Sequence, residues 1–505
     1  MIEHTRELLA RIIEDSALVA RVRRLDARTL GSVIRHVGLE NAGELVALAT
    51  ADQVRDMFDD DLWTAPNPGE AEKFDGKRFG LWLEIMLESG EQFVANKLME
   101  LPEELVTLGF ARLVYVLDAD ELAMQMSDND DDCQLDKAMD NCLREDIDQY
   151  IVISRHHDYW DAAIAVLTAL DQDNHSFLSG LLERLCNASS EHFEDNGGLY
   201  EVLTSDEMIE EDGTAERDER RATAGFVSQS DATAFLRLPT VMGFDDVVKT
   251  KKRDTISASY FRVMASTANQ RIVADQTDDA DAERFNELLI NAGVAERPRP
   301  MLEAVGSENK PLFQQTMMSI REDEREKYEK RTEELTYLTN VLVSGGSYLG
   351  RSFRPAEAAE ASICTCSIGM DYLQSKSSVS PKTILKNYDA DHLFRIGWHM
   401  LFHNVAMKAA HSIERKCIEH SVPMRLLGSV RIAIDDMKPS IIRSKMAQIT
   451  RHIEFDNREK HMYGCLLDIC PVMQIPSSEE QDVQQTRFFA STNDIDTIAA
   501  MLESD

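Results

Sequence analysis

Three histidines, His392, His399 and His403, are the residues whose type and spacing come closest to a reactive site. On a helix with 100° between successive residues, their side chains fall within about 40° of one another. Two histidines four residues apart on one helix face can bind a single Zn²⁺ or Fe²⁺ ion. One interpretation of this segment is therefore a metal-dependent enzyme built around the three imidazoles.

The residues around the three histidines favour a structural role. No Glu follows His399, as a metalloprotease helix would require, and Arg395 lies on the same face, where a guanidinium disfavours a bound cation. Apolar residues occupy nearly all the other positions, namely Leu393, Phe394, Ile396, Trp398, Leu401, Phe402 and Val405. We therefore expect a buried helix whose histidines form a polar seam, hydrogen-bonded or paired with acids, and we expect no metal and no cofactor.

The remaining metal-type motifs are incomplete. His157 and Asp161 are one turn apart, a spacing typical of an exposed helix start. The pair Cys364 and Cys366 lacks the two-residue gap and the second pair of a zinc knuckle. Cys465 and Cys470 are expected to be buried like small apolar residues.

Two acidic runs resemble calcium loops only superficially. The run 128–132 has carboxylates at alternate positions, but it has no Gly at the sixth position and has Met139 at the twelfth. The run 171–175 has Ser176 and Leu182 at those two positions. Neither run is an EF-hand, although weak surface binding of divalent ions is left open. The Gly-rich stretch 345–350 follows a predicted helix and lacks Gly-Lys-Ser/Thr, so it predicts helix termination and no phosphate-binding loop.

Composition places the chain among helical proteins of a reducing compartment. Only 23 Gly and 13 Pro interrupt 505 residues, which favours long helices over many short strands. Eight cysteines without tight pairing do not suggest a disulfide framework. The N-terminus has no apolar signal segment, and no stretch of 18 uncharged apolar residues occurs, so we expect a cytoplasmic bacterial protein without membrane insertion.

The charge of the chain is large and unevenly distributed. The net charge of −36 repels phosphate backbones, so nucleic-acid binding is not expected. Two segments, 118–148 and 191–219, each carry twelve acidic residues, whereas 376–460 carries fifteen Lys or Arg against nine Asp or Glu. We expect this basic segment to contact acidic surface, in this chain or in a protein partner; the alternative is that all three segments are solvated helix faces.

Helix signals predict an all-α fold. Asp26, Thr50 and Pro102 each begin an amphipathic helix, at intervals that approximate one and two periods of a helix hairpin. We therefore expect stacked helical hairpins, a superhelix of the HEAT type, followed by a helical C-terminal domain. The helical pattern also runs from Ile151 to Leu185. The expected divisions are a helical-repeat domain at 1–185, an acidic loop with a helical extension at 186–240, a linker region with short helices at 241–300, and a helical domain at 301–505.

Several sequence blocks together resemble a known family. They are Leu25–Leu30, Asp60–Trp63, Gly225–Ala232, Glu334–Val343, Glu357–Glu360, Phe394–Trp398 and Arg487–Ser491. These blocks span nearly the whole chain, which resembles a large uncharacterised bacterial family known only as a domain of unknown function. That resemblance implies no assigned activity and no catalytic residues. The first 110 residues are also similar to the helical N-domain of magnesium transporters of the MgtE type, which implies stacked helices and protein contacts.

The function that these observations favour is a non-enzymatic scaffold or regulator that binds other proteins. It depends on helix stacking, charge segregation and the absence of a strong catalytic motif. The alternative is a metal-dependent enzyme that uses His392, His399 and His403. A third hypothesis, nucleic-acid binding through 376–460, fits the net charge worst.

Overall fold

Helices dominate the computed structural model of the chain. It describes residues 22–65, 72–119, 143–196, 206–223, 225–268, 310–348, 351–377, 379–468, 474–476 and 486–504. Helices account for 74% of these residues and strands for 6%, so the all-α expectation is confirmed, with three small sheets added. Among the described residues, no helix has both the length and the apolar character needed to cross a membrane.

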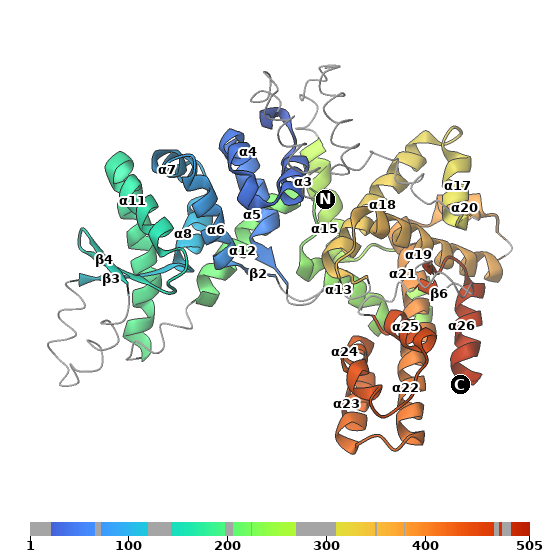
Figure 1. Cartoon of the computed structure of the whole chain (residues 1–505). Coiled ribbons are helices and arrows are strands. Elements are labelled where there is room, and N and C mark those ends of the chain that lie inside the picture. The colour runs from blue at the N-terminus through green and yellow to red at the C-terminus, as the bar shows by residue number, and fades with distance from the viewer. Residues whose placement is uncertain are drawn as a thin grey trace. The chain divides into compact units, whose positions relative to one another are not determined.

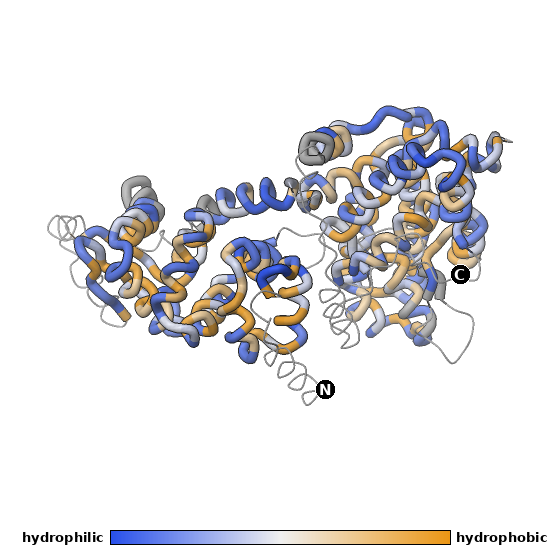
Figure 2. The backbone as a smooth tube through the Cα atoms, turned by 90° about the horizontal axis from the view of Figure 1, so that it is seen from above, coloured by the Kyte–Doolittle hydropathy of each residue, from blue (hydrophilic) through white to orange (hydrophobic). Residues whose placement is uncertain are grey.

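The chain divides into two compact units, each with a hydrophobic core of its own. The N-terminal unit comprises the described residues of Met1–Thr64 and Glu72–Glu219, and the C-terminal unit begins at Arg220. The first core includes Phe58, Phe79 and Trp82, and Figure 2 shows how apolar residues recur along its helices. The second core is larger and includes the apolar residues of the helix that carries His392 and His399.

The three predicted helix starts of the N-terminal unit are confirmed. Helix α3 (Ala27–Val37) begins after Asp26, whose carboxylate accepts a hydrogen bond from the Thr29 amide at 2.9 Å. Helix α5 (Ala51–Asp61) begins with a capping box between Thr50 and Gln53. Pro102 directly precedes α8 (Glu103–Ala111), where its missing N–H costs no hydrogen bond. Local capping chemistry therefore determines these helix starts.

Helices of the N-terminal unit pack in near-succession along the chain. Helix α3 contacts α5, α4 (Gly43–Leu48) contacts α6 (Gly76–Leu87), α6 contacts α7 (Glu91–Met99), and α7 contacts α11 (Trp160–Asn196). Figure 1 shows these helices side by side, from dark blue to teal. The short 3₁₀ helix η1 (Leu39–Asn41) joins α3 to α4, and β1 (Trp63–Thr64) pairs with β2 (Lys73–Phe74).

A three-stranded antiparallel sheet corrects the expectation of helix from Ile151 onward. Its strands β3 (Val114–Asp118), β5 (Tyr150–Ser154) and β4 (Arg144–Ile147) lie in that order, with Val116 opposite Val152. The segment 150–154 is rich in β-branched residues, which favour a strand once a neighbouring strand is available. Helix α11 begins only at Trp160, and it contacts β3.

The C-terminal unit is a helical bundle around α21 (Ala390–Leu401). Helices α18 (Arg325–Gly345), α19 (Pro355–Lys376) and α13 (Gln229–Val241) contact α21, and every residue of α21 is buried. Gly225, which follows α12 (Asp206–Thr223), has a φ of 91°, a left-handed conformation that is typical of the residue after a helix end. Further helices of this bundle are α14 (Phe244–Lys249), α15 (Thr255–Ala268), α17 (Leu312–Ile320) and α20 (Pro381–Asn387).

Two glycines allow α19 and α21 to approach closely. A Cβ atom on Gly397 would overlap the carbonyl oxygen of Thr365, and one on Gly369 would overlap that of Leu393. Each helix therefore presents a glycine to the backbone of the other, a reciprocal contact that no larger residue permits.

The chain continues from α21 into a lobe of three helices. A π-helical segment, η5 (Phe402–Ala406), leads into α22 (Met407–Glu419), which is followed by α23 (Met424–Asp435) and α24 (Pro439–Ile449). We call α22, α23 and α24 the C-terminal lobe; it lies at the lower right of Figure 1. The remaining elements are α25 (Asn457–Leu466), the strand pair β6 (Gln474–Pro476) and β7 (Thr486–Phe488), and α26 (Thr492–Ser504).

Candidate functional site

The three histidines lie along α21 and η5 and donate hydrogen bonds to backbone carbonyls. His392 Nε2 lies 2.9 Å from the Val247 oxygen, and His399 Nδ1 lies 2.7 Å from the Pro239 oxygen. His403 Nε2 lies 2.9 Å from the Thr240 oxygen. Because a carbonyl oxygen only accepts, each ring nitrogen in these contacts carries a proton. The expectation of buried, hydrogen-bonded histidines is confirmed for His392 and His399, and His403 is half-buried.

The positions of these carbonyls explain why histidines are needed. Pro239 and Thr240 lie in the last turn of α13, and Val247 lies in the last turn of α14. The last four carbonyls of a helix have no partner within that helix. The histidines therefore satisfy the carbonyls at the ends of two helices that pack against α21, and the bonds of His392 and His399 are buried.

Burial keeps two of the imidazoles neutral. Desolvation lowers the pKa of His392 to about 4, although its hydrogen bond to Val247 acts in the opposite direction. The pKa of His399 is also lowered, mainly by burial, and its ring stacks on that of Phe244. Neutral imidazoles suit both a hydrogen-bonded seam and a metal ligand.

The structure brings two of the three histidines together. The ring centroids of His399 and His403 are 4.2 Å apart, and each ring has one nitrogen that contacts no carbonyl of the described residues. Among the described residues, the groups of three or more potential metal ligands lie elsewhere: one is the exposed set Asp148, Asp171 and His175, and the other is Glu334, Asp389 and Asp391.

The other sequence candidates occupy unremarkable positions. His157 and Asp161 are exposed around the start of α11, as expected. Cys364, Cys366 and Cys465 are buried free thiols, and burial raises the pKa of all three. Residues 171–175 span a kink in α11 at Asn174, whose φ of −148° and ψ of 72° are not helical, and Asp171 and His175 belong to the exposed set named above. Cys470 and the run 128–132 lie outside the described residues.

A buried ion-pair network was not anticipated from the sequence. The Glu334 carboxylate accepts hydrogen bonds from Arg331 Nη1 at 2.8 and 2.9 Å and from the Ala390 amide at 2.8 Å. Arg253 approaches the same carboxylate from outside α18, and Arg331 also pairs with Asp389. One ion pair of this network could have been predicted from the sequence, because Arg331 and Glu334 are three residues apart on one helix and so lie on the same face.

Asp391 occupies the far end of this network. Its carboxylate is fully buried and accepts no hydrogen bond from the part of the chain that the structure describes, and it lies 3.5 Å from both Arg253 Nε and Arg395 Nη2. Burial raises the pKa of Asp391, and the two guanidinium groups act against that rise. Arg395 therefore belongs to this network, which accounts for a charged residue on the histidine face of a buried helix.

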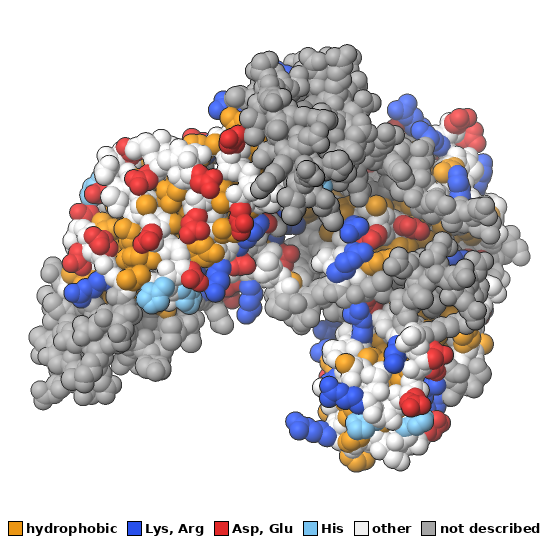
Figure 3. Space-filling view, viewed as in Figure 1, with side chains coloured by type: hydrophobic (Ala, Val, Ile, Leu, Met, Phe, Trp, Pro, Cys, Tyr) orange, Lys and Arg blue, Asp and Glu red, His pale blue; other side chains and the backbone are white. Residues whose placement is uncertain are grey.

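An open pocket of about 570 Å³ lies between α23 and α24, within the basic segment 376–460. Its lining residues are Pro423, Arg425, Leu426, Ser429, Lys445, Gln448, Arg451 and His452. Figure 3 shows Lys and Arg side chains over the C-terminal lobe and many Asp and Glu side chains over the N-terminal unit. The sequence indicated the basic segment, but only the packing of two helices produces a concave site within it.

Comparison with known proteins gives a family and no activity. A family model described as a family of unknown function (DUF6178) matches residues 4–431. No curated protein and no solved structure matches the chain.

Proposed function

The chain belongs to this family of unknown function, and we propose that it is a non-enzymatic interaction protein whose C-terminal lobe docks an acidic surface of a partner protein. The observation that carries the proposal is a mixed apolar and basic face on α23. Met424 is 76% exposed and Ile432 is 61% exposed, and the exposed Arg431, which pairs with Glu414, lies beside them. Large apolar side chains and arginine are enriched in protein interfaces.

Helix geometry places these residues on one stripe. Met424, Gly428 and Ile432 are four residues apart in turn, so they follow one another along the same side of α23. A Cβ atom on Gly428 would meet nothing within 4 Å, so the stripe is open along this length. Ile418, at the end of α22 and directly before the turn into α23, is 50% exposed.

Charge supports an acidic partner surface. The segment 376–460 carries a net charge of +6 in a chain of −36. A basic surface attracts acidic partners over a range of about 10 Å at moderate ionic strength, and it repels basic ones. The exposed apolar side chains then provide the short-range attraction that survives at high salt.

The proposal also covers the architecture of the N-terminal unit and the cellular compartment of the protein. The succession of helices from α3 to α11 supports a degenerate stack of helical hairpins, a superhelix of the HEAT type. We propose that this stack makes protein contacts, as the resemblance of its sequence to the N-domain of MgtE-type transporters implies. In this proposal the protein acts in the bacterial cytoplasm.

The experiment is an affinity purification of the full chain with matched variants. The wild type and the double variant M424S/I432S are compared at low salt, with Val379→Ser as the control, because Val379 is 37% exposed in the loop between α19 and α20. We expect one protein partner to bind the wild type and V379S, to be lost from the double variant, and to bind more weakly, without complete release, as salt increases. A partner that binds all three proteins equally, or that is indifferent to salt up to molar concentration, contradicts this proposal.

The alternative function is a metal-dependent enzyme that uses the histidine helix. The observation in its favour is the 4.2 Å separation of the His399 and His403 rings, each with one nitrogen that contacts no carbonyl in the described part of the chain. We propose instead that the histidines only hydrogen-bond the carbonyls at the ends of α13 and α14. Each histidine has such a backbone partner, and the positive charge of Arg395 on the same helix face disfavours a bound metal ion. Elemental analysis that finds about one zinc or iron per chain, lost in the His399 and His403 variants, would establish the alternative.

A further inference from the structure

The pocket between α23 and α24 is lined by basic residues, although the chain as a whole is strongly acidic. Arg425, Lys445, Arg451 and His452 contribute to it, and its eight lining residues include no Asp or Glu. By contrast, residues 1–219 hold 50 acidic against 18 basic residues, a net charge of −32. The pocket is thus a local concentration of positive charge in a strongly acidic protein.

The cations of this pocket differ from their neighbours in that no acidic partner for them lies among the described residues. Arg425, Lys445 and Arg451 form no ion pair with any residue in the described part of the chain. Nearby, Arg431 pairs with Glu414 at 2.8 Å, Arg443 with Asp468 at 3.4 Å and Lys416 with Glu459 at 3.5 Å. Three unneutralised cations around one cavity repel each other, and an anion in the cavity relieves that repulsion.

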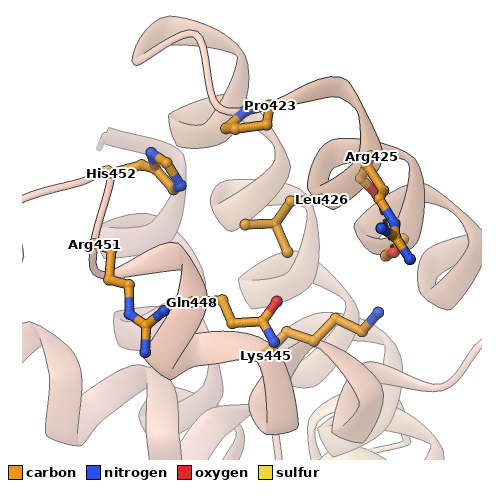
Figure 4. Close-up of a pocket in the computed structure, with 8 residues that line it drawn as sticks. Pro423, Arg425, Leu426, Lys445, Gln448, Arg451 and His452 are labelled. Atoms are coloured by element: carbon orange, nitrogen blue, oxygen red, sulfur yellow. Dashed lines mark hydrogen bonds between the residues drawn. The ribbon is translucent and has the colours of Figure 1, made fainter.

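Figure 4 shows how the side chains surround the cavity. Leu426 lies at the centre, with Gln448 and Lys445 on the α24 side, Arg451 and His452 to one side and Arg425 to the other. Two pocket residues of α23, Arg425 and Ser429, are one turn apart, and Lys445 and Gln448 on α24 are three residues apart. The two helices therefore each present one face to the cavity.

We propose that this pocket binds the phosphate group of a small phosphorylated molecule. Arg offers planar paired donors that match phosphate oxygens, and Lys offers a compact charge beside them. Gln448 and Ser429 supply neutral hydrogen-bonding groups, and Pro423 and Leu426 supply an apolar wall for the rest of the molecule. A volume of about 570 Å³ lies in the range of small-molecule sites.

A small ligand fits this pocket better than a nucleic acid does. Nucleic-acid binding depends on many phosphate contacts along a basic surface, and the net charge of −36 opposes a long polyanion. A single phosphate monoester needs only the local field of the pocket. The proposal is separate from the docking of a protein partner, because Leu426 at the centre of the pocket lies about 160° around α23 from the middle of the stripe of Met424, Gly428 and Ile432, with Arg425 and Ser429 between the two.

The test is isothermal titration calorimetry of the full chain at low salt. The probes are inorganic phosphate, ribose 5-phosphate and adenosine 5′-monophosphate, with adenosine as the uncharged control and a twelve-nucleotide single strand as the polyanion. The variants are Lys445→Gln and Arg451→Gln, both at the pocket. Lys438→Gln is the matched control, because Lys438 is an exposed lysine of the same lobe that does not line the pocket. Circular dichroism checks that each variant is folded.

We expect at least one phosphate monoester to bind with a stoichiometry of one per chain, and adenosine not to bind. Loss of one charge-assisted contact should weaken that binding about tenfold or more in K445Q and in R451Q, with K438Q unchanged. The proposal is overturned if no phosphate probe binds, if adenosine binds as well as its monophosphate, if K438Q weakens binding as much as the pocket variants do, or if only the twelve-nucleotide strand binds.

Discussion

His399 Nδ1 lies 2.7 Å from the carbonyl oxygen of Pro239, a residue 160 positions earlier in the chain. Four residues further along, His403 makes the same kind of contact with the neighbouring Thr240. One helix thus provides the C-terminal hydrogen-bond partners of another. This relationship ties α21 and η5 to the end of α13, and it gives two conspicuous histidines a physical role without a metal.

Replacement of His399 by Gln should lower the free energy of unfolding by roughly 1 kcal/mol, the net value of one buried hydrogen bond. Denaturant titration measures this change, and H420Q is the control, because His420 is exposed. The purified wild type should contain no stoichiometric transition metal. A marked decrease in melting temperature after chelator treatment of the wild type would contradict the structural role.

Stability should fall on mild acidification because of His392. Its pKa is about 4 in the folded chain, below the usual value of 6.5, so between these values the unfolded state binds the proton first. The contribution of His392 to stability is complete above pH 6.5 and decreases as the pH falls from 6.5 toward 4, by about 1.4 kcal/mol per unit at most.

The measurement for His392 is the free energy of unfolding of the wild type and H392Q at pH values between 4 and 7. The wild type should lose more stability than the variant over this interval. The comparison isolates the imidazole, because the buried acids Glu334 and Asp391, whose pKa values are raised, titrate in both proteins. Parallel curves for the two proteins would show that His392 is not the group that titrates.

Replacement of Glu334 by Gln should be among the most destabilising single changes, by about 3–5 kcal/mol. It removes one of the two carboxylates that Arg331 faces and leaves only Asp389, and Arg331 is itself only 3% exposed. The control is E333Q, one residue away on the exposed side of α18, which should change stability by less than about 0.5 kcal/mol. Equal effects of the two changes in chemical denaturation would mean that Glu334 does not hold the network together.

Two Gly→Ala changes should act in opposite directions. At Gly397 the new methyl group would overlap the carbonyl oxygen of Thr365, so α19 and α21 must separate, at a cost of about 1–3 kcal/mol or more. At Gly428, on the open face of α23, nothing lies within 4 Å, so the same change should stabilise the helix by about 0.5–1 kcal/mol. Thermal unfolding of the two variants measures both effects. A tolerated G397A would refute the close contact between the two helices.

Local patterns predicted much of the secondary structure. The caps at Asp26 and Thr50, the helix end at Gly345 and the buried apolar helix around Trp398 all depend on residues within a few positions of one another. Such interactions form within one turn of helix, so composition and spacing suffice to find them. The strand Tyr150–Ser154 was expected to be helix, although β4 directly precedes it and pairs with it as a hairpin; the other partner, β3, lies more than thirty residues earlier, where no local pattern reveals it.

The sequence by itself thus determined that the chain is helical, where several helices begin, and that three histidines share one face of a buried helix. Tertiary structure alone decided what those histidines bond to, because Pro239, Thr240 and Val247 lie more than a hundred residues away. It also brought Arg253 to Glu334 across 81 positions and opened a basic pocket between α23 and α24. These features arise where separate helices meet, and no pattern within one helix specifies its neighbour.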